Sequence, residues 1–270
     1  MSTYHAKKRL GQNFLTSEKV ISHIVELVSP SPEQTIIEVG SGRGALTVPL
    51  AESGAKLWAI EFDRDLIDHL DRLLVDYSNV TVLGRDFLAF DPSQYNLERF
   101  TLVGNLPYNI TSPVIDWCIR YHDRITKGYF MMQREVVNRL TAAPGTHDWS
   151  PISIVAQLHF DLTCCFEVPP HAFTPVPEVV SAFVELTPIP VRSDVDMTAL
   201  DKVVRASFQQ RRKQLVNNVV PSLIPDAETA RRILQVLGLR ETVRAEELSI
   251  DQFCRLTNHL MAGGTSERRS

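Results

Sequence analysis

The sequence contains little cysteine. Only four cysteines occur in 270 residues, at positions 118, 164, 165 and 254, and their spacing is not typical of metal ligands. The adjacent Cys164 and Cys165 cannot readily be joined to each other in a disulfide. We therefore expect chemistry that needs no metal ion, in a reducing compartment.

Long apolar runs are also missing. Residues 1–10 are polar and basic, and no run approaches the ~20 apolar residues that span a membrane. The sequence thus predicts neither a signal peptide nor a membrane anchor, and we expect a cytoplasmic protein. The absence of a heptad seam or an extended apolar stripe favours a monomer.

The chain has no excess of positive charge, because its formal net charge is -4. Contacts to phosphate require Lys and Arg, so this overall charge is unfavourable for nucleic-acid binding. The charge is unevenly distributed, however, since residues 188–270 carry 13 Lys/Arg against 10 Asp/Glu. We expect contacts to nucleic acid, where they occur, to be local.

Short apolar runs alternate with stretches of helical periodicity over the first two thirds of the chain. Strands are predicted at residues 35–39, 57–60, 80–83, 101–103, 128–133, 161–168 and 179–186, and helices at 16–28, 44–53, 64–74, 112–121, 135–140 and 152–160. This alternation predicts an α/β fold of the Rossmann-like kind, with a parallel sheet covered by helices on both faces.

Two prolines at 188 and 190 interrupt this pattern and are typical of a linker. After them only helical periodicity recurs, at residues 197–208, 214–220, 228–237 and 250–261. We therefore expect two domains, an α/β domain over residues 1–187 and a small all-α domain over residues 188–270.

Residues 38–45 form a glycine loop between a predicted strand and a predicted helix. Gly40, Gly42 and Ala45 fit the dinucleotide pattern, in which glycine lets the backbone turn tightly and approach a ligand. The loop alone is compatible with NAD, with S-adenosylmethionine (SAM), or with a tight turn that binds nothing. Other residues must decide between them.

Two acidic residues follow the next two predicted strands. Glu61 lies 21 residues after Gly40, where a carboxylate can accept hydrogen bonds from the ribose hydroxyls that both NAD and SAM offer. Asp86 follows the third strand and could accept a hydrogen bond from an adenine amino group. Each acid alone is more often a solvated loop residue. Their shared place at the carboxyl ends of parallel strands indicates a nucleotide-like ligand.

The segment Asn105-Leu106-Pro107-Tyr108 follows the fourth strand. The exocyclic nitrogen of adenine is a poor nucleophile because its lone pair is delocalised into the ring. A catalyst must therefore accept hydrogen bonds from both of its N–H groups. The Asn105 side-chain oxygen and the Leu106 carbonyl can do so, Pro107 fixes the backbone, and Tyr108 can stack on an extruded base. Alone, the tetrapeptide would be read as a turn. After the glycine loop and the two acids it predicts SAM-dependent methylation of a base amine.

With these residues the sequence resembles the ribosomal RNA adenine dimethyltransferase family. The resemblance rests on residues 11–15, 38–45, 105–108, 133–140, 173–177 and 208–213. The last segment resembles the ribosome-biogenesis branch rather than the antibiotic-resistance methylases of large-subunit RNA. The resemblance implies SAM contacts from Asn13, Leu15, Gly40, Glu61, Asp86 and Asn105. It also implies a substrate, two adjacent adenosines in the 3′-terminal hairpin of 16S rRNA, each dimethylated.

The sequence departs from the family pattern at two places. Ser41 stands where the family usually has proline, in a loop that keeps its glycines. Residues 145–151 lack the Tyr-Gly pair and the following basic residue that the family commonly has. In that loop, Trp149 offers a replacement stacking surface for RNA.

Candidate RNA contacts come from clustered basic residues and one aromatic residue. The basic candidates are Lys7, Lys8, Arg9, Arg211, Arg212 and Lys213, with further arginines at 205, 231, 232, 240 and 244. A solvated helix face is the alternative for each cluster. Phe173 lies in a proline-rich loop and could either wall the base pocket opposite Tyr108 or belong to the core.

Three other functions remain open at this stage. DNA adenine methylation uses a similar motif, and an NAD-dependent oxidoreductase is supported only by the glycine loop and Glu61. A ribosome-assembly role without catalysis is compatible with the family resemblance as an additional function.

Overall fold

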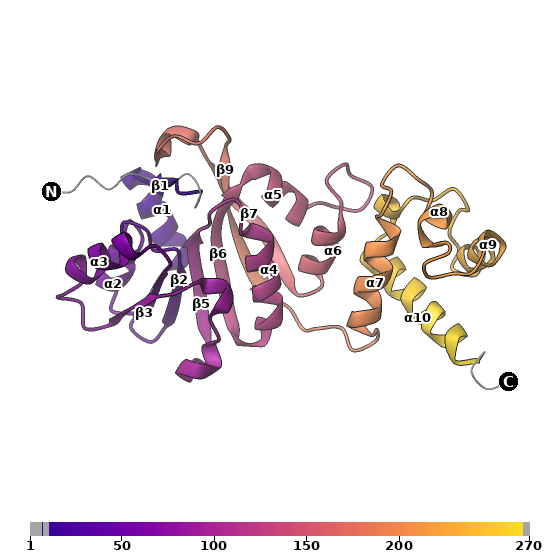
Figure 1. The fold of residues 1–270 in the computed structure, drawn as a ribbon, viewed down its shortest axis with the longest axis horizontal. Coiled ribbons are helices and arrows are strands. Elements are labelled where there is room, and N and C mark those ends of the chain that lie inside the picture. The colour runs from indigo at the N-terminus through magenta and orange to yellow at the C-terminus, as the bar shows by residue number, and fades with distance from the viewer. Residues whose placement is uncertain (1–6, 8–10, 267–270) are drawn as a thin grey trace. The chain divides into compact units, whose positions relative to one another are not determined.

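The computed structural model describes residue 7 and residues 11–266, with side chains described up to residue 262. The chain divides into two compact units (Figure 1). The first comprises Met1–Val137 and Phe160–Pro188, and the second comprises Asn138–His159 and Ile189–Ser270.

A seven-stranded sheet forms the centre of the first unit. Its strands, in spatial order, are β4 (Val80–Gly84), β3 (Lys56–Glu61), β2 (Thr35–Val39), β5 (Phe100–Asn105), β6 (Ile125–Gln133), β9 (Ser181–Pro188) and β7 (Phe160–Val168). The first five run parallel, whereas β9 is antiparallel to both of its neighbours. The Rossmann-like α/β architecture predicted from the sequence is confirmed.

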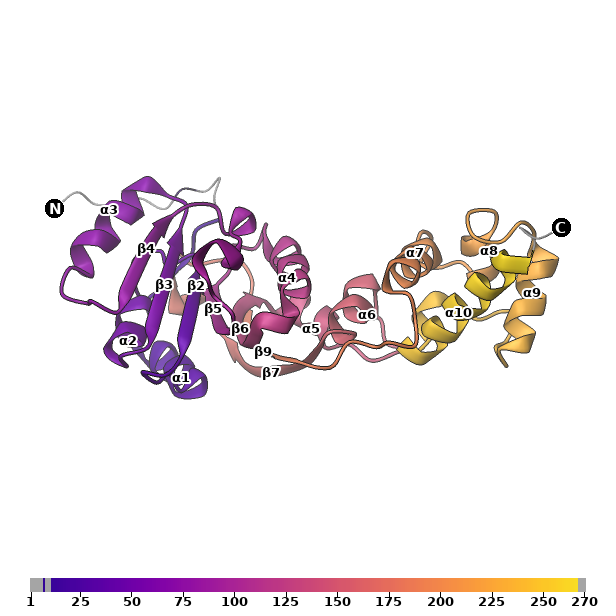
Figure 2. The same cartoon turned by 90° about the horizontal axis from the view of Figure 1, so that it is seen from below.

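Helices cover both faces of this sheet, as buried parallel strands require. Helices α1 (Glu18–Val28), α2 (Thr47–Glu52) and α3 (Arg64–Leu73) lie on one face, and α4 (Thr111–Arg120) lies on the other (Figure 2). Neighbouring residues of β2 serve opposite faces, and Ile36, which packs with α1 and α2, and Ile37 are both fully buried. This two-sided burial explains the continuous apolar runs of the central strands.

The strands that follow β2 in the chain are added on both sides of it, so the order of the sheet changes direction there. Strand β3 lies on one side of β2 and β5 on the other, so the connections after β2 and β5 leave in opposite directions. In parallel α/β sheets a crevice opens at the carboxyl ends of the strands at such a point. The glycine loop after β2 and the tetrapeptide after β5 both belong to this crevice.

Two short strands that the sequence did not predict hold the N-terminal segment. β1 (Phe14–Leu15) pairs antiparallel with β8 (Phe173–Thr174), so Leu15 lies opposite Phe173. The Thr16 amide also donates to the Ala172 carbonyl at 2.8 Å. These bonds bring residues 11–13 to the carboxyl ends of the central strands.

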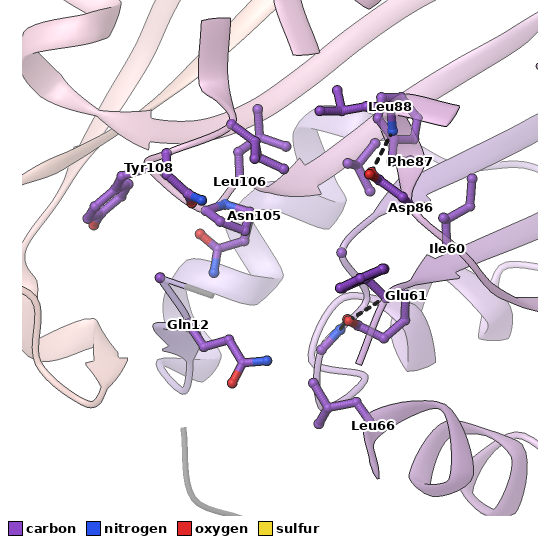
Figure 3. A pocket seen from close by; sticks show the side chains of 18 of the residues that line it. Gln12, Ile60, Glu61, Leu66, Asp86, Phe87, Leu88, Asn105, Leu106 and Tyr108 are labelled. Atoms are coloured by element: carbon purple, nitrogen blue, oxygen red, sulfur yellow. Dashed lines mark hydrogen bonds between the residues drawn. The ribbon is translucent and has the colours of Figure 1, made fainter. Parts of the chain in front are cut away.

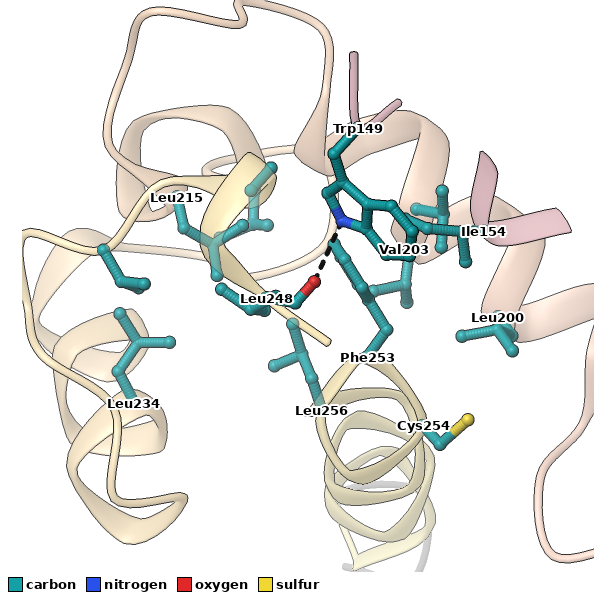
Figure 4. Close-up of a cluster of buried hydrophobic side chains, with 14 of the residues drawn as sticks. Trp149, Ile154, Leu200, Val203, Leu215, Leu234, Leu248, Phe253, Cys254 and Leu256 are labelled. Carbon is teal, nitrogen blue, oxygen red and sulfur yellow. Dashed lines mark hydrogen bonds between the residues drawn. The ribbon is translucent and has the colours of Figure 1, made fainter. Parts of the chain in front are cut away.

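The second unit is helical. It contains α6 (Pro151–Gln157), α7 (Met197–Ser207), α8 (Leu215–Val219), α9 (Ala227–Val236) and α10 (Ile250–Ser266), while α5 (Arg134–Leu140) begins in the first unit and ends in the second. Trp149, in the loop before α6, is 0% exposed and its indole N–H donates to the Leu248 carbonyl at 3.0 Å (Figure 4).

Two expectations about residues 138–159 are corrected by this packing. The sequence-based boundary after residue 187 placed this segment in the first domain, but Trp149 and Ile154 belong to the core formed with α7 and α10. Because the Trp149 ring is fully buried, it offers no stacking surface for RNA. Burying this large apolar ring in the helical core stabilises the folded protein more than leaving it in water would.

Candidate active site

A cavity of about 250 Å³ lies at the carboxyl ends of β2, β3 and β5. The glycine loop, Glu61 and Asp86 line it, and so do residues 11–14 and 105–110. Figure 3 shows Asn105 and Tyr108 on one side of this space, with Glu61 and Asp86 on the other. The structure therefore brings together the two motifs that the sequence analysis had linked only by strand order.

The glycine loop needs glycine for its backbone conformation. Gly40 and Gly42 have φ of +73° and +57°, a left-handed region that side chains disfavour. A Cβ built on Gly40 would meet nothing within 4 Å, so open space adjoins the backbone there. The Gly40 amide donates to the Ile60 carbonyl at 2.9 Å, which ties the loop to the end of β3.

The Glu61 carboxylate is oriented by three backbone amides. One oxygen accepts from Gly42 at 2.8 Å, and the other accepts from Phe62 at 2.7 Å and from Asp63 at 2.9 Å. A carboxylate has about four acceptor positions, so one remains for a ligand hydroxyl. With 8% exposure, Glu61 is a fixed acceptor at the cavity wall.

Glu38, the first residue of the loop motif, is a structural acid. It is 2% exposed and accepts a hydrogen bond from the Thr47 hydroxyl at 2.6 Å. Burial raises the pKa of Glu38 to about 7, and the nearby charge of Glu61 acts in the same direction. This carboxyl joins the end of β2 to the start of α2 and does not line the cavity.

Asp86 caps the short 3₁₀ turn Phe87–Ala89 by accepting from the Leu88 amide at 2.9 Å. Arg85, which the sequence analysis did not single out, stabilises the same turn: its guanidinium donates to the Tyr95 hydroxyl at 2.7 Å and to the Ala89 carbonyl at 3.3 Å. Both residues line the cavity. The only sequence signal for Arg85 was its place beside Asp86.

Phe62 is a second cavity residue that the sequence analysis missed. Phe62 directly follows Glu61 in the chain, lines the cavity and is 64% exposed. An exposed aromatic face at this point can pack against a flat heterocycle whose ribose is held by Glu61.

The Asn105 amide has a defined orientation. Its NH₂ group donates to the Asn13 carbonyl at 2.8 Å, so the side-chain oxygen remains as the acceptor. The following residue is anchored as well, because the Leu106 amide donates to the Met131 carbonyl of β6 at 3.1 Å. The N-terminal segment thus orients the amide that the sequence analysis assigned to catalysis.

Gly104 precedes this motif in a place too narrow for a side chain. A Cβ there would lie 2.7 Å from the Val39 carbonyl oxygen and 3.1 Å from the Val39 Cβ. We expect Gly104→Ala to lower the free energy of unfolding by about 2 kcal/mol, because β2 and β5 would have to separate. Urea denaturation measures this. As a control, Gly128→Ala in β6 would place a Cβ 3.3 Å from the Leu186 and Phe130 side chains, so it should lose less, and an equal loss there would contradict the steric explanation.

The cavity contains most of the residues assigned from the sequence, but not all of them. Asn13, Gly40, Glu61, Asp86 and the tetrapeptide at 105–108 line it. Leu15 and Phe173 do not, because they are 5% and 1% exposed and pack in the core behind the β1–β8 pair. Phe173 is therefore a core residue rather than a wall of the base pocket.

The basic candidates differ in their availability. The Lys7 ammonium lies 2.6 Å from Asp63 and 2.8 Å from Asp65, whose hydrogen bonds raise the Lys7 pKa. Lys8 and Arg9 lie outside the described residues. Lys7 thus ties the N-terminal segment to the start of α3 and is committed to carboxylates of its own chain.

In the helical unit, Arg211 is bound to Glu246 at 3.2 Å. The adjacent Arg212 and Lys213 are exposed, and their side chains form no hydrogen bond or ion pair within the described part of the chain. Most other arginines of this unit face carboxylates, at positions 192, 205, 231, 232, 240 and 244. Within the described residues, the cluster at 211–213 therefore has one cation paired with a carboxylate and two that are not.

Among the described residues, no three His, Cys, Asp or Glu side chains are grouped so that they could hold a metal ion. Nor does any helix of the same residues combine the length and apolar character needed to cross a membrane.

Comparison with known proteins agrees with the site. The family model described as Ribosomal RNA adenine dimethylase matches residues 3–262. Among curated relatives, Ribosomal RNA small subunit methyltransferase A of Buchnera aphidicola is 39% identical over 264 residues, covering 96% of this chain and 98% of the relative. The protein of the same name from Chromobacterium violaceum is 39% identical and covers 96% and 97%.

Solved structures show the same fold. A dimethyladenosine transferase from Plasmodium falciparum superposes with a TM-score of 0.80 at 23% identity, covering 93% of this chain and 98% of that one. The 23S rRNA methyltransferase ErmE gives a TM-score of 0.71 at 25% identity, covering 92% and 100%. With a family match over almost its entire length and relatives of 39% identity, the chain belongs to the ribosomal RNA adenine dimethylase family.

Proposed function

We propose that the protein uses SAM to dimethylate the N6 amines of two adjacent adenosines in the 3′-terminal hairpin of 16S rRNA. The observation that carries this proposal is the orientation of Asn105. Its amide donates to the Asn13 carbonyl at 2.8 Å, which leaves an oxygen acceptor at the cavity opposite Glu61 and Asp86. The names of the relatives support a small-subunit rRNA substrate.

The cavity residues fit SAM. Glu61 retains an acceptor for a ribose hydroxyl, Asp86 can accept from an adenine amine, and the open space beside Gly40 allows close approach of the ligand to the backbone. When bound, SAM supplies an electrophilic methyl group on a sulfonium. NAD would also satisfy Glu61, but it would give no role to the tetrapeptide at 105–108.

The protein activates the target amine by accepting its hydrogen bonds. The Asn105 oxygen and the Leu106 carbonyl can accept one hydrogen bond each from the two N–H groups, which favours a pyramidal nitrogen with an available lone pair. Tyr108 lines the same cavity and can stack on the extruded base. No strong base is required, because the methylated nitrogen is cationic and loses its proton readily. Alignment and electrostatics carry most of the catalysis.

The proposal is tested by incubating the protein with labelled SAM and undermethylated small ribosomal subunits, followed by nucleoside analysis. We expect dimethyladenosine in 16S rRNA and none in an adenine-containing DNA duplex. Methylation of the DNA alone would favour the DNA methyltransferase alternative. A thermal shift with NAD but not with SAM would overturn the cofactor assignment, and no methylation by a SAM-binding preparation would overturn the substrate.

We also propose that Arg212 and Lys213 form part of the RNA contact surface of the helical unit. The double variant Arg212→Ala/Lys213→Ala should bind RNA more weakly and lower the slope of log K against log salt by about 1.5, because two phosphate contacts and their released counterions are lost. Binding titrations from low to high salt measure the slope.

The adjacent pair Arg231→Ala/Arg232→Ala is a matched control for charge. Both arginines already face carboxylates, at 3.6 Å and 3.3 Å, so their removal should change the slope less. Equal slopes for the two double variants would contradict the assignment.

We further propose that the protein acts as a monomer in the cytoplasm, where its ribosomal substrate is made.

A further inference from the structure

The hydroxyl of Tyr108 has a partner that no sequence motif indicated. Its oxygen lies 3.0 Å from the Ser181 hydroxyl, which is contributed by the first residue of β9. The two residues are 73 positions apart in the chain. Ser181 is 0% exposed and does not line the cavity, whereas Tyr108 is half-buried and does.

Ser181 is a rigid point of attachment. Its backbone lies between two strands, opposite Gln133 of β6 and opposite Val168 of β7. The preceding residue is fixed as well, since the Val180 carbonyl accepts from the Arg134 amide at 3.0 Å. A buried hydroxyl needs a hydrogen-bond partner, and the Tyr108 hydroxyl supplies it.

The position of this bond determines what it restrains. The tyrosine hydroxyl lies on the axis about which the ring rotates through χ2, so holding it restricts χ1, the torsion that decides where the ring points. The backbone of the turn is already held, by the Leu106 amide on Met131 at 3.1 Å and the Ile110 amide on Pro107 at 3.1 Å. Ser181 therefore fixes the remaining torsion that would let the ring swing away from the cavity.

The two methyl transfers place different demands on this ring. In each, the adenine nitrogen uses its lone pair to form a bond to the methyl carbon, the carbon–sulfur bond breaks with its electrons returning to sulfur, and the nitrogen then releases a proton to water. Before the first transfer the amine can donate two hydrogen bonds, to Asn105 and Leu106. After the first transfer the secondary amine can donate only one hydrogen bond. Its orientation then depends more strongly on base stacking.

We infer that Ser181 is a positioning residue that acts through Tyr108, and that its contribution is larger in the second methyl transfer than in the first. This inference rests on the proposed function. Its consequence is that dimethylation, rather than methylation as such, requires a ring held at a fixed angle. The hydrogen bond between Tyr108 and Ser181 helps to set the number of methyl groups that the product carries.

The test is a time course of monomethyladenosine and dimethyladenosine in undermethylated small subunits. Ser181→Ala should slow the second transfer about fivefold relative to the first, the effect of losing one net hydrogen bond, so monomethyladenosine accumulates. Tyr108→Phe, which keeps the ring and removes the same bond, should give a similar ratio. The double variant should show no further change, because both substitutions remove one interaction.

Two controls separate this effect from a general loss of stability. Ser181→Thr keeps a hydroxyl and should restore the wild-type product ratio. Ser53→Ala removes a serine bond to the Leu50 carbonyl outside the cavity and should leave the ratio unchanged. Should Ser181→Ala fail to fold, Tyr108→Phe alone decides the question.

The outcomes distinguish the inference from the proposed function. A wild-type protein that produces no dimethyladenosine overturns the proposed function. A wild-type protein that dimethylates, together with unchanged monomethyl to dimethyl ratios in Ser181→Ala and Tyr108→Phe, overturns the role of Ser181. Equal slowing of both transfers also contradicts it, since it would show that the ring matters equally for both amines.

Discussion

Replacing Asn105 by alanine should reduce methyl transfer by about a hundredfold to a thousandfold. The substitution removes one of two acceptors for the target amine, and losing a preorganised partner of the reacting group has effects of this size. It also leaves the Asn13 carbonyl without its donor. Single-turnover assays with labelled SAM and undermethylated subunits measure the loss.

The binding properties of the same variant show whether the loss is catalytic. Asn105 is one of many residues that line the candidate SAM cavity, so its loss should lower SAM affinity, but only modestly. Affinity for the ribosomal subunit should not change. Gln94→Ala, an exposed amide in the same unit and outside the cavity lining, serves as a control with unchanged activity. Near-normal turnover by Asn105→Ala would contradict the proposed chemistry, and complete loss of SAM binding would make Asn105 a cofactor ligand first.

Replacing Trp149 by alanine should destabilise the helical unit by about 4 kcal/mol. The ring is fully buried and its N–H donates to the Leu248 carbonyl at 3.0 Å, so the substitution creates a large cavity and leaves a buried carbonyl without that donor. Hydrogen exchange of α7 and α10, together with denaturant unfolding of the full chain, measures the effect. Trp149→Phe keeps most of the apolar volume and should lose less.

The same variant tests the division of the chain into two units. Because residues 138–159 belong to the helical unit, Trp149→Ala should leave SAM binding by the first unit intact while weakening RNA binding. An equal loss of SAM affinity would contradict that division. An unaltered exchange pattern in α7 and α10 would instead show that Trp149 contributes little to their stability.

Some of the site could be predicted because it depends on local order along the chain. Gly40, Glu61, Asp86 and Asn105 each lie at the end of a strand or just after it, and parallel strands end at one edge of a sheet. The strand order, the glycine loop and the tetrapeptide were therefore enough to predict a shared cavity. The same reasoning gave the helical character of the C-terminal region, since its apolar residues recur at helical spacing.

Other residues could not be assigned from local patterns. The environments of Leu15 and Phe173 depend on the pairing of β1 with β8, over 150 positions apart in sequence. Arg211 resembles its neighbours Arg212 and Lys213 in sequence, yet only Arg211 meets the carboxylate of Glu246. Trp149 lies in a polar loop, and its burial follows from contacts with α7 and α10.

The sequence by itself determined the fold class, the central strands along the chain, the family and the chemical groups at the cavity, because hydrophobic periodicity and short motifs are local properties of the chain. Tertiary structure alone decided the direction of the Asn105 amide, the attachment of Tyr108 to Ser181, which cations pair with carboxylates and which aromatic rings are buried. These features are hydrogen bonds, ion pairs and packing between distant segments. Their partners are chosen by the folded backbone, which no short stretch of sequence specifies.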